Sequence, residues 1–556
     1  MRVNGLVLAA CAGVWALGVG AQEPAGPEAA RPRLVVMIAV DQMIPEQLER
    51  LRSHFTGGFA RFANQGRVHR RALLGYSRTE TGPGHASYGT GCWPRTHGIV
   101  ANDFRDAERG GWTYCAGDED ARPITRLGLE ADSKHYRVSP RNLLVDGAAA
   151  WFERSWSGAK TVSISGKDRA SILMAGRGAD TAVWWDKYRC GFTTSDHYGD
   201  ALPAWAAEWN LGWRERCDGY VWEPLVPLDE LVGTGTEADD REGEASCSSN
   251  GRVFPHPAPP LSDEPNGKQI EQLGHYVYIS PLVDAHTLEL ARRAVVAEDL
   301  GGDEQVDLLC ISLTACDTVG HLTGPYSAET TDVLLRADRE LGCLFDLLDE
   351  RLGPDGWIAS LSADHGVLEL PEARRARLEP GGRLVAKQIK AAREGMRAAL
   401  NERFGTHFRA ALGGGGAYLD PTELAGHDAA AVRAFARDYL LREVDWIAGA
   451  FTSDELLAAD RRDGDPFFEL ARNSTTPTRG PDVAIRVVPW TLIDRATGTT
   501  HGTPYPYDRR VPLVFLGPGF EAGTIWEPAD SADALPTILH ALGVEFDAAA
   551  FDGVAR

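Results

Sequence analysis

The chain has 556 residues, of which 43% are hydrophobic, so it can bury a large core as one elaborated domain or as several smaller ones. Its formal net charge of -22 argues against a nucleic-acid-binding protein, which needs a basic face. An anionic substrate would therefore need bound metals or a few well-placed Arg and Lys side chains.

The first segment of the chain, residues 1–21, resembles a cleavable secretory signal. Arg2 precedes an apolar run at residues 6–16, and small residues follow that run. We therefore expect a periplasmic or secreted protein, and lipoprotein anchoring at Cys11 is the less favoured alternative. Residues 22–32 read as a linker rich in Pro, Ala and Glu. No later apolar run is long enough to span a bilayer, so no stable membrane span is expected.

Beyond the linker, apolar runs alternate with amphipathic helical patterns. Continuous apolar runs predict strands buried on both faces at residues 33–40, 306–313 and 357–361, and a further strand is expected at residues 160–165. Helices are expected at residues 85–91, 143–154, 281–297 and 328–351. This alternation predicts an α/β fold with a mostly parallel central sheet flanked by helices.

Two stretches interrupt this pattern and are interpreted as insertions that form cap regions. They divide the chain into core segments at 33–197, 281–370 and 481–556, and insertions at 198–280 and 371–480. A strand expected at residues 482–489 falls in the last core segment. Removing the signal leaves eight cysteines, whose pairing the sequence leaves open, as it does the oligomeric state.

Acidic and imidazole side chains follow the predicted strands at their carboxyl ends, where open α/β sheets bind ligands. These residues are Asp41, Asp317, His321, Asp364, His365 and His501. A lone His is more often a packed or surface residue, but the shared placement of all six favours a metal site. Oxygen and imidazole ligands suit zinc, and a pair of divalent ions suits in-line displacement at phosphorus.

The stretch TGPGH, which begins at Thr81, supplies a candidate nucleophile ahead of the helix expected at residues 85–91. Gly82 and Gly84 allow the backbone to approach a ligand closely, and metal coordination would activate the hydroxyl. Taken alone, the motif favours a capping Thr in an ordinary Gly-rich turn over a nucleophile. Lys167 and Arg169 would point the same way in an extended segment and bind one anion, or else form a solvated basic turn.

Together these motifs resemble those of the alkaline phosphatase superfamily, in the order that this family shows and over most of the chain. The resemblance implies two Zn²⁺ ions and a covalent phosphothreonine. It implies that one ion binds Asp41, Thr81, Asp364 and His365, and the other Asp317, His321 and His501.

Asn102, Lys167 and Arg169 resemble the phosphate-binding set of the PafA-type phosphomonoesterases within that superfamily. The resemblance implies an exported, zinc-dependent alkaline phosphomonoesterase that acts on small phosphate monoesters. A nucleotide pyrophosphatase/phosphodiesterase on the same scaffold is the alternative, and a non-catalytic extracellular metal-binding protein is a third interpretation.

Two neighbouring residues offer rival nucleophiles. Cys92 begins a match to the C-x-P-x-R signature of sulfatases, but Thr96 replaces its final Arg. Thr79 lies two residues before Thr81 and lacks the TxxGH spacing to His85. Both are therefore interpreted as non-catalytic.

Overall fold

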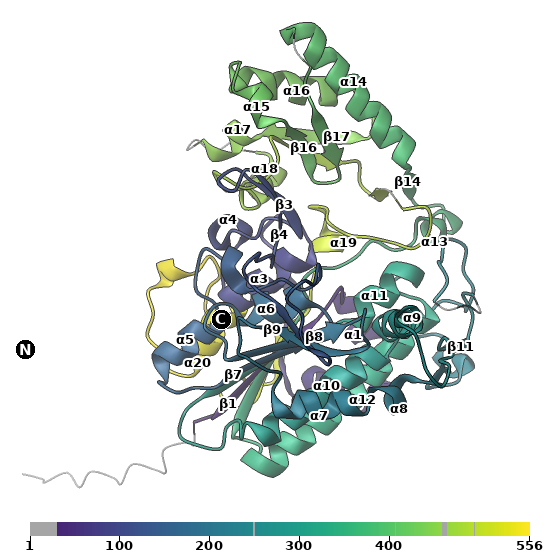
Figure 1. Ribbon diagram of the computed structural model, residues 1–556, viewed down its shortest axis with the longest axis vertical. Coiled ribbons are helices and arrows are strands. Elements are labelled where there is room, and N and C mark those ends of the chain that lie inside the picture. Colours follow the sequence, from purple (N-terminus) through teal and green to yellow (C-terminus); the bar gives the residue numbers. More distant parts are fainter. Residues whose placement is uncertain (1–30, 248, 250, 406, 459–463, 494) are drawn as a thin grey trace, which may run out of the picture.

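The structure is a computed structural model that describes residues 31–247, 249, 251–405, 407–458, 464–493 and 495–556. The segment expected to be a signal and most of the expected linker lie outside these residues. Figure 1 shows a large α/β core with a second lobe above it, drawn in green.

The core is organised around an 11-stranded sheet whose central strands are parallel. The adjacent central strands are β13 (Trp357–Ser362), β1 (Leu34–Val40), β12 (Asp307–Leu313), β7 (Thr161–Ser165) and β8 (Thr181–Asp186). Every residue of β1 is buried, as expected for an apolar strand covered on both faces. The strands predicted at residues 33–40, 160–165, 306–313 and 357–361 therefore lie side by side in this sheet.

Antiparallel strands extend the sheet on both sides and make it mixed as a whole. One side carries β20 (Leu513–Leu516), β2 (Arg67–Ala72) and β21 (Gly523–Ala529), of which β21 runs parallel to β2. The other side carries β9 (Gly191–Ser195), β5 (Pro123–Thr125) and β6 (Gly128–Leu129). The parallel arrangement expected from the sequence thus holds for the central strands, where helices connect consecutive strands.

Helices cover both faces of the sheet (Figure 1). Those above it in this view include α3 (Thr81–Thr90) and α6 (Asp168–Ala175), and those below include α7 (Ala204–Leu211), α10 (Leu282–Ala297) and α12 (Ala328–Leu352). The other core helices are α1 (Pro45–Arg50), α2 (Gly58–Gln65), α4 (Pro94–His97), α5 (Ala148–Ser155), α11 (Ala315–Thr323), α19 (Pro506–Arg509) and α20 (Ala534–Ala541). A hairpin of β3 (Asp103–Asp106) and β4 (Gly111–Tyr114) lies between the core and the second lobe.

Two predicted helix starts are wrong. α5 begins at Ala148 rather than at residue 143, because Leu143 and Gly147 adopt extended conformations, and Gly147 packs directly against the backbone of Gly176. α3 begins at Thr81 itself rather than at His85. The Gly-rich sequence there is helical because its small residues pack closely against neighbouring backbone.

The first insertion shares the main hydrophobic core. It contains α7, α8 (Trp213–Cys217), β10 (Val221–Trp222), β11 (His256–Pro257) and α9 (Gly267–Tyr278). Trp205, Trp209 and Trp222 are buried in the same cluster as the residues of β1. Burying these large aromatic side chains attaches the insertion to α10, and Trp222 Nε1 donates to Asp332 Oδ2 of α12 at 2.6 Å.

The second insertion forms the upper lobe in Figure 1, with a hydrophobic core of its own that includes Met396, Leu400 and Val432. A four-stranded sheet of β15 (Ala410–Gly413), β16 (Gly416–Leu419), β18 (Val483–Val487) and β17 (Ile447–Thr452) packs there with α14 (Ala386–Phe404) and α16 (Ala429–Glu443). The same region contains α13 (Pro371–Ala376), β14 (Gly382–Leu384), α15 (Pro421–Leu424), α17 (Ser453–Leu457), α18 (Pro466–Arg472) and β19 (Thr491–Ile493).

The strand expected at residues 482–489 belongs to this lobe and not to the core. As β18 it pairs with β16 and β17, and Val483 and Val487 are buried in the core of the lobe. The expected boundary between residues 480 and 481 therefore does not coincide with the point where the chain leaves the four-stranded sheet of the lobe for the central sheet.

Among the described residues, every helix is too short or too polar to cross a membrane. The eight cysteines left open by the sequence are all described, and each is a free thiol in this structure.

Candidate active site

The carboxyl ends of three adjacent central strands bring three aspartates together. Asp41 follows β1 directly, Asp364 follows β13, and Asp317 lies in the first turn of α11, which follows β12. All three side chains are almost completely buried. Residues far apart in the chain meet here because these strands are neighbours in the sheet and run parallel.

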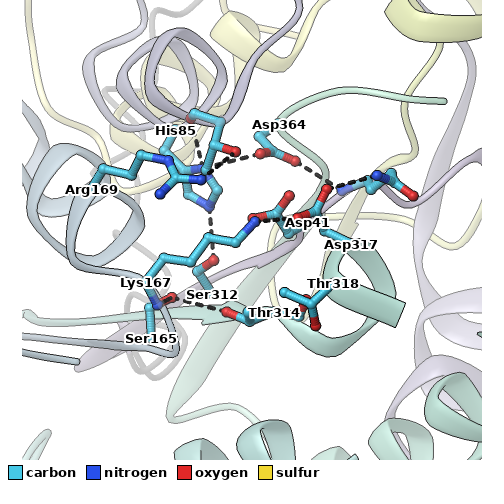
Figure 2. Close-up of polar contacts among 12 residues, drawn as sticks. Asp41, His85, Ser165, Lys167, Arg169, Ser312, Thr314, Asp317, Thr318 and Asp364 are labelled. Atoms are coloured by element: carbon cyan, nitrogen blue, oxygen red, sulfur yellow. Dashed lines mark hydrogen bonds and ion pairs between the residues drawn. The ribbon is translucent and has the colours of Figure 1, made fainter. Parts of the chain in front are cut away.

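A buried lysine lies between two of these carboxylates, as Figure 2 shows. Lys167 Nζ is 2.5 Å from Asp41 Oδ2 and also donates to Asp317 Oδ2. Burial alone would lower the pKa of Lys167, but the carboxylates of Asp317 and Asp41 raise it above its ordinary value. Lys167 therefore carries a positive charge that neutralises part of the acidic cluster.

The charge of the cluster is still incompletely balanced. Burial and the negative charges of Asp317 and Asp364 raise the pKa of Asp41 well above its ordinary value. Burial also acts to raise the pKa of Asp364, but His365 and His85 lower it below the usual range. Several carboxylates this close and this deeply buried favour additional cations.

Three imidazole rings at the site are oriented in the same way. In each ring Nδ1 faces a backbone carbonyl oxygen: His321 that of Thr499 at 2.8 Å, His365 that of Gly366 at 3.0 Å, and His501 that of Thr79 at 2.6 Å. A hydrogen bond from Nδ1 leaves the lone pair on Nε2, which is the usual arrangement of a metal-binding histidine.

The Nε2 atoms of these rings point at the carboxylates. His365 Nε2 lies 3.2 Å from Asp364 Oδ2 and 3.6 Å from Asp41 Oδ1. Asp317 Oδ1 lies 3.1 Å from His321 Nε2 and 3.8 Å from His501 Nε2. A lone pair facing an acidic oxygen is unfavourable unless a proton or a metal ion lies between them.

Buried atoms without hydrogen bonds strengthen this argument. Within the part of the chain that the structure describes, Asp41 Oδ1, Asp364 Oδ2 and His365 Nε2 lack hydrogen-bond partners. Unpaired buried polar atoms are costly, and these three converge on one another. The residues present therefore fit a divalent metal ion.

Spatial proximity groups the ligands somewhat differently from the family resemblance. One compact group contains Asp317, His365 and His501, and another contains Asp41, His85 and Asp364. His365 lies between the two groups, because its ring also stacks on His501 with centroids 3.5 Å apart. The Nε2 atom of His365 faces the carboxylates of both Asp41 and Asp364.

Thr81 begins α3 directly beside this cluster. Arg169 Nη2 donates to Thr81 Oγ1 at 3.3 Å, and Asn102 Oδ1 accepts from Gly82 N at 2.7 Å. Gly84 lies so close to Asp364 that an added Cβ would be 2.1 Å from its carbonyl oxygen. The glycines thus allow α3 to pack closely against Asp364 at the end of β13. This packing places the Thr81 hydroxyl and the Asn102 amide at the site.

Lys167 and Arg169 reach the site by a route that differs from the predicted one. The expected extended segment is wrong, since Lys167 is the N-cap residue of α6 and Arg169 lies in its first turn. Lys167 extends toward Asp41 and Arg169 toward Thr81, so the two side chains converge. Figure 2 shows both side chains beside the acidic cluster. The structure therefore brings all ten sequence-predicted site residues to one edge of the sheet.

Sequence reasoning missed Gln42. Its backbone N–H donates to Asp364 Oδ1 at 3.0 Å, and its side-chain amide donates to Asp317 Oδ1 at 2.7 Å. Gln42 has a φ of 69°, a left-handed conformation that costs energy for a residue with a side chain. Its position directly after Asp41 at the strand end was the available signal.

The site also depends on His85, to which the sequence assigned no separate role. Its Nδ1 lies 3.0 Å from the Thr81 carbonyl oxygen and 3.4 Å from Asp364 Oδ2, and its Nε2 lies 2.8 Å from Ser312 Oγ. His85 therefore connects α3 to β12 and β13.

The rival nucleophiles lie in other surroundings. The thiol of Cys92 donates to the Ala550 carbonyl oxygen at 3.4 Å, and burial raises its pKa to about 11. Thr79 Oγ1 donates to the Thr503 carbonyl oxygen at 3.0 Å and accepts from Gly502 N at 3.2 Å. Thr79 thus holds the loop that carries His501.

A cavity of about 400 Å³ opens beside the cationic residues. Its lining includes Lys167, Arg169, Lys187, Tyr114 and Tyr278. Lys187 lies directly after β8, and Tyr278 ends α9 of the first insertion. The cavity therefore adds positive charge and aromatic surface next to the candidate nucleophile.

Comparisons with known proteins agree with this geometry. Residues 35–460 match the family model described as type I phosphodiesterase / nucleotide pyrophosphatase. The chain is 32% identical to the alkaline phosphatase PafA of Elizabethkingia meningoseptica, over 94% of this chain and 93% of that one. It is 28% identical to the alkaline phosphatase PhoV of Synechococcus elongatus, over 93% of this chain and 91% of that one.

Solved structures of alkaline phosphatase PafA have the same fold. The wild-type structure superimposes with a TM-score of 0.84 at 30% identity, covering 95% of this chain and 98% of that one. A PafA variant with a Thr, an Asn, a Lys and an Arg replaced matches with the same TM-score at 29% identity and the same coverage. The chain belongs to the type I phosphodiesterase / nucleotide pyrophosphatase family and, within the alkaline phosphatase superfamily, to its PafA-type branch.

Proposed function

We propose that the protein is an exported alkaline phosphomonoesterase that binds two Zn²⁺ ions and transfers the phosphoryl group of its substrate to Thr81. One observation carries the proposal: carboxylates and imidazole Nε2 atoms converge beside a hydroxyl that Arg169 already contacts. The names of the similar alkaline phosphatases support the same activity. Export rests on the N-terminal sequence alone.

We divide the proposed ligands as the family resemblance implies, and the contacts between carboxylate oxygens and imidazole Nε2 atoms support this division. Asp41, Thr81, Asp364 and His365 would hold one ion, and Asp317, His321 and His501 the other. When bound, the two ions would activate the hydroxyl and stabilise the oxygen that leaves. Gln42 would keep the carboxylates of Asp364 and Asp317 in place through its two hydrogen bonds.

The reaction has two steps. Thr81 Oγ1 loses its proton to solvent and forms a bond to phosphorus while the bond between phosphorus and the ester oxygen breaks, and that oxygen takes up a proton from solvent and leaves as the alcohol. The oxygen of a water molecule then bonds to phosphorus while the bond between phosphorus and Thr81 Oγ1 breaks, and a proton from the water restores the Thr81 hydroxyl as inorganic phosphate is released. The position of Thr81 at the start of α3 adds backbone N–H groups near the transferred phosphoryl group.

Lys167, Arg169 and Asn102 favour a monoester over a diester. A monoester dianion offers three unsubstituted oxygens to donors, whereas a diester carries less charge and an additional group on one of them. The replaced Thr and Asn in the PafA variant are separated by the same number of residues as Thr81 and Asn102. Its replaced Lys and Arg are spaced as Lys167 and Arg169 are. The neighbouring cavity leaves room for the alcohol part of the substrate.

The second candidate function is hydrolysis of phosphodiesters, which the description of the matching family favours. A rate panel of aryl phosphate monoester, phosphate diester and sulfate ester, combined with metal analysis of the purified protein, separates the two. We expect the monoester to react fastest in protein that holds at least two zinc ions per chain. A faster diester would establish the phosphodiesterase, and absence of turnover by zinc-loaded protein would favour the non-catalytic interpretation.

A further inference from the structure

A second set of metal-ligating side chains is buried in the first insertion, separate from the catalytic residues. Cys247 lies in a loop of this insertion, His256 lies on β11, and Glu329 is the second residue of α12. One ligand atom from each of these three side chains lies within 4.8 Å of the others. All three residues are buried, so this cluster differs from the solvated acidic groups that are common on protein surfaces.

The polar contacts in this Cys247 cluster bring sulfur, imidazole and carboxylate groups together. His256 Nε2 lies 3.2 Å from Glu329 Oε1. Burial, followed by the negative charges of Glu329, Glu244 and Asp239, raises the pKa of the Cys247 thiol. Three acidic residues therefore surround one thiol and one imidazole.

Two of these acids each have one carboxylate oxygen without a hydrogen-bond partner among the described residues. Glu244 is 3% exposed, and its Oε2 accepts from Arg241 N at 2.8 Å. Asp239 Oδ2 accepts from Phe254 N at 3.1 Å. Their other oxygens, Glu244 Oε1 and Asp239 Oδ1, lack a hydrogen-bond partner among the described residues. Buried carboxylate oxygens without partners are expensive, which indicates that a cation belongs beside them.

We propose that Cys247, His256 and Glu329 bind a structural Zn²⁺ ion, with the carboxylates of Glu244 and Asp239 beside it. A thiolate, an imidazole and a carboxylate are ligands that zinc accepts together, and a buried set that includes a thiolate is typical of structural sites. Binding would deprotonate the thiol and neutralise the excess acidic charge. This proposal does not rest on the proposed function, because it uses other residues.

The site would fix a loop that supports two segments of the catalytic edge. Ala245 N donates to the Leu322 carbonyl oxygen at 2.8 Å, next to His321. The carbonyl oxygen of Gly243 accepts from Gly498 N at 2.6 Å, in the segment that leads to His501. Metal binding between this loop and α12 would therefore stabilise the insertion where it touches α11 and residues 498–501.

Cobalt substitution of the full chain tests the proposal directly. A thiolate bound to Co²⁺ gives a near-ultraviolet charge-transfer band, and the proposed catalytic ligands include no cysteine. We expect this band in the Co²⁺-loaded wild-type protein, together with one metal ion per chain beyond those at the catalytic edge. Absence of the band from the wild-type protein overturns the proposal and needs no folded variant.

Variants locate the site. C247A and E329Q should each lose one metal ion per chain, and C247A should also lose the charge-transfer band. The matched control is C310A, since Cys310 is equally buried, on β12, and its thiol lies in the hydrophobic core. A band that persists in C247A, or an equal loss in C310A, would place the thiolate ligand elsewhere and overturn the assignment. Catalytic failure with the band intact would count against the proposed function alone.

Discussion

The catalytic edge of the central sheet and the Cys247 cluster both bury carboxylates beside imidazoles, yet they are built differently. The catalytic edge draws its proposed ligands from five segments between Asp41 and His501, which the folded core brings together. The Cys247 cluster draws on one loop region and the start of α12. One set offers oxygen and nitrogen beside a hydroxyl and two cations, whereas the other adds sulfur among buried side chains.

This difference indicates which of the two clusters can catalyse a reaction. An open position and a nucleophile are needed for catalysis, and the catalytic edge has Thr81 next to a cavity of about 400 Å³. A site closed by buried side chains contributes folding free energy instead. Substitutions at the catalytic edge should therefore change turnover, and substitutions at the Cys247 cluster should change the stability of the fold.

The largest expected effect comes from Thr81→Ala. Because this variant removes the proposed nucleophile, we expect monoester turnover to fall by roughly 10³-fold or more, with fold and zinc content kept. Steady-state kinetics with metal analysis checks this. Thr90→Ala is the matched control, since Thr90 lies in the same helix and its hydroxyl donates to the Ala86 carbonyl oxygen and accepts from Cys92 N. Full activity in Thr81→Ala would disprove the nucleophile assignment.

A smaller and selective effect is expected from Arg169→Ala. Arg169 Nη2 already contacts Thr81 Oγ1, so its loss removes a charged donor for the transferred phosphoryl group. We expect kcat/KM for an aryl monoester to fall about 10²-fold, and that for a diester clearly less. Lys167→Ala should likewise lower kcat/KM more for the monoester than for the diester. Equal losses on both substrates would contradict the monoesterase interpretation.

Thr79→Ala should have a modest effect on the catalytic edge. Its hydroxyl holds Gly502 and Thr503, so the loop that carries His501 would be less well fixed. We expect turnover at limiting zinc to fall about 10-fold and excess zinc to restore part of it, as for other residues that orient metal ligands. Thr79→Ser keeps the hydroxyl and serves as the control. A loss in Thr79→Ala as complete as that in Thr81→Ala would revive Thr79 as the nucleophile.

The smallest effect on turnover is expected at the Cys247 cluster. Cys247→Ser should leave kcat close to the wild-type value at saturating zinc but lower the Tm, because a structural metal contributes folding free energy. Thermal unfolding and kinetics on the same preparation measure both quantities. The exposed Cys343 provides the control substitution, Cys343→Ser, which should change neither. A selective loss of turnover without a change in Tm would remove the distinction between the two clusters.

The sequence by itself determined the central strands, since an apolar run such as residues 33–40 is stable only when both faces are covered. It also determined the candidate ligands, because strand ends such as Asp41 and Asp364 must meet at one edge of a parallel sheet. These signals are local patterns repeated along the chain, so they can be recognised without knowledge of the fold.

Only the tertiary structure decided the start of α3 at Thr81, the sheet to which β18 belongs, and the roles of Gln42 and His85. Glycine-rich segments have weak local preferences, and close packing against Asp364 fixes this one as a helix. The sequence of β18 does not indicate which strands it pairs with. The burial of Val483 and Val487 in the core of the upper lobe determines the sheet to which β18 belongs. The Cys247 cluster likewise depends on contacts between an insertion and a distant helix, which pattern alone does not reveal.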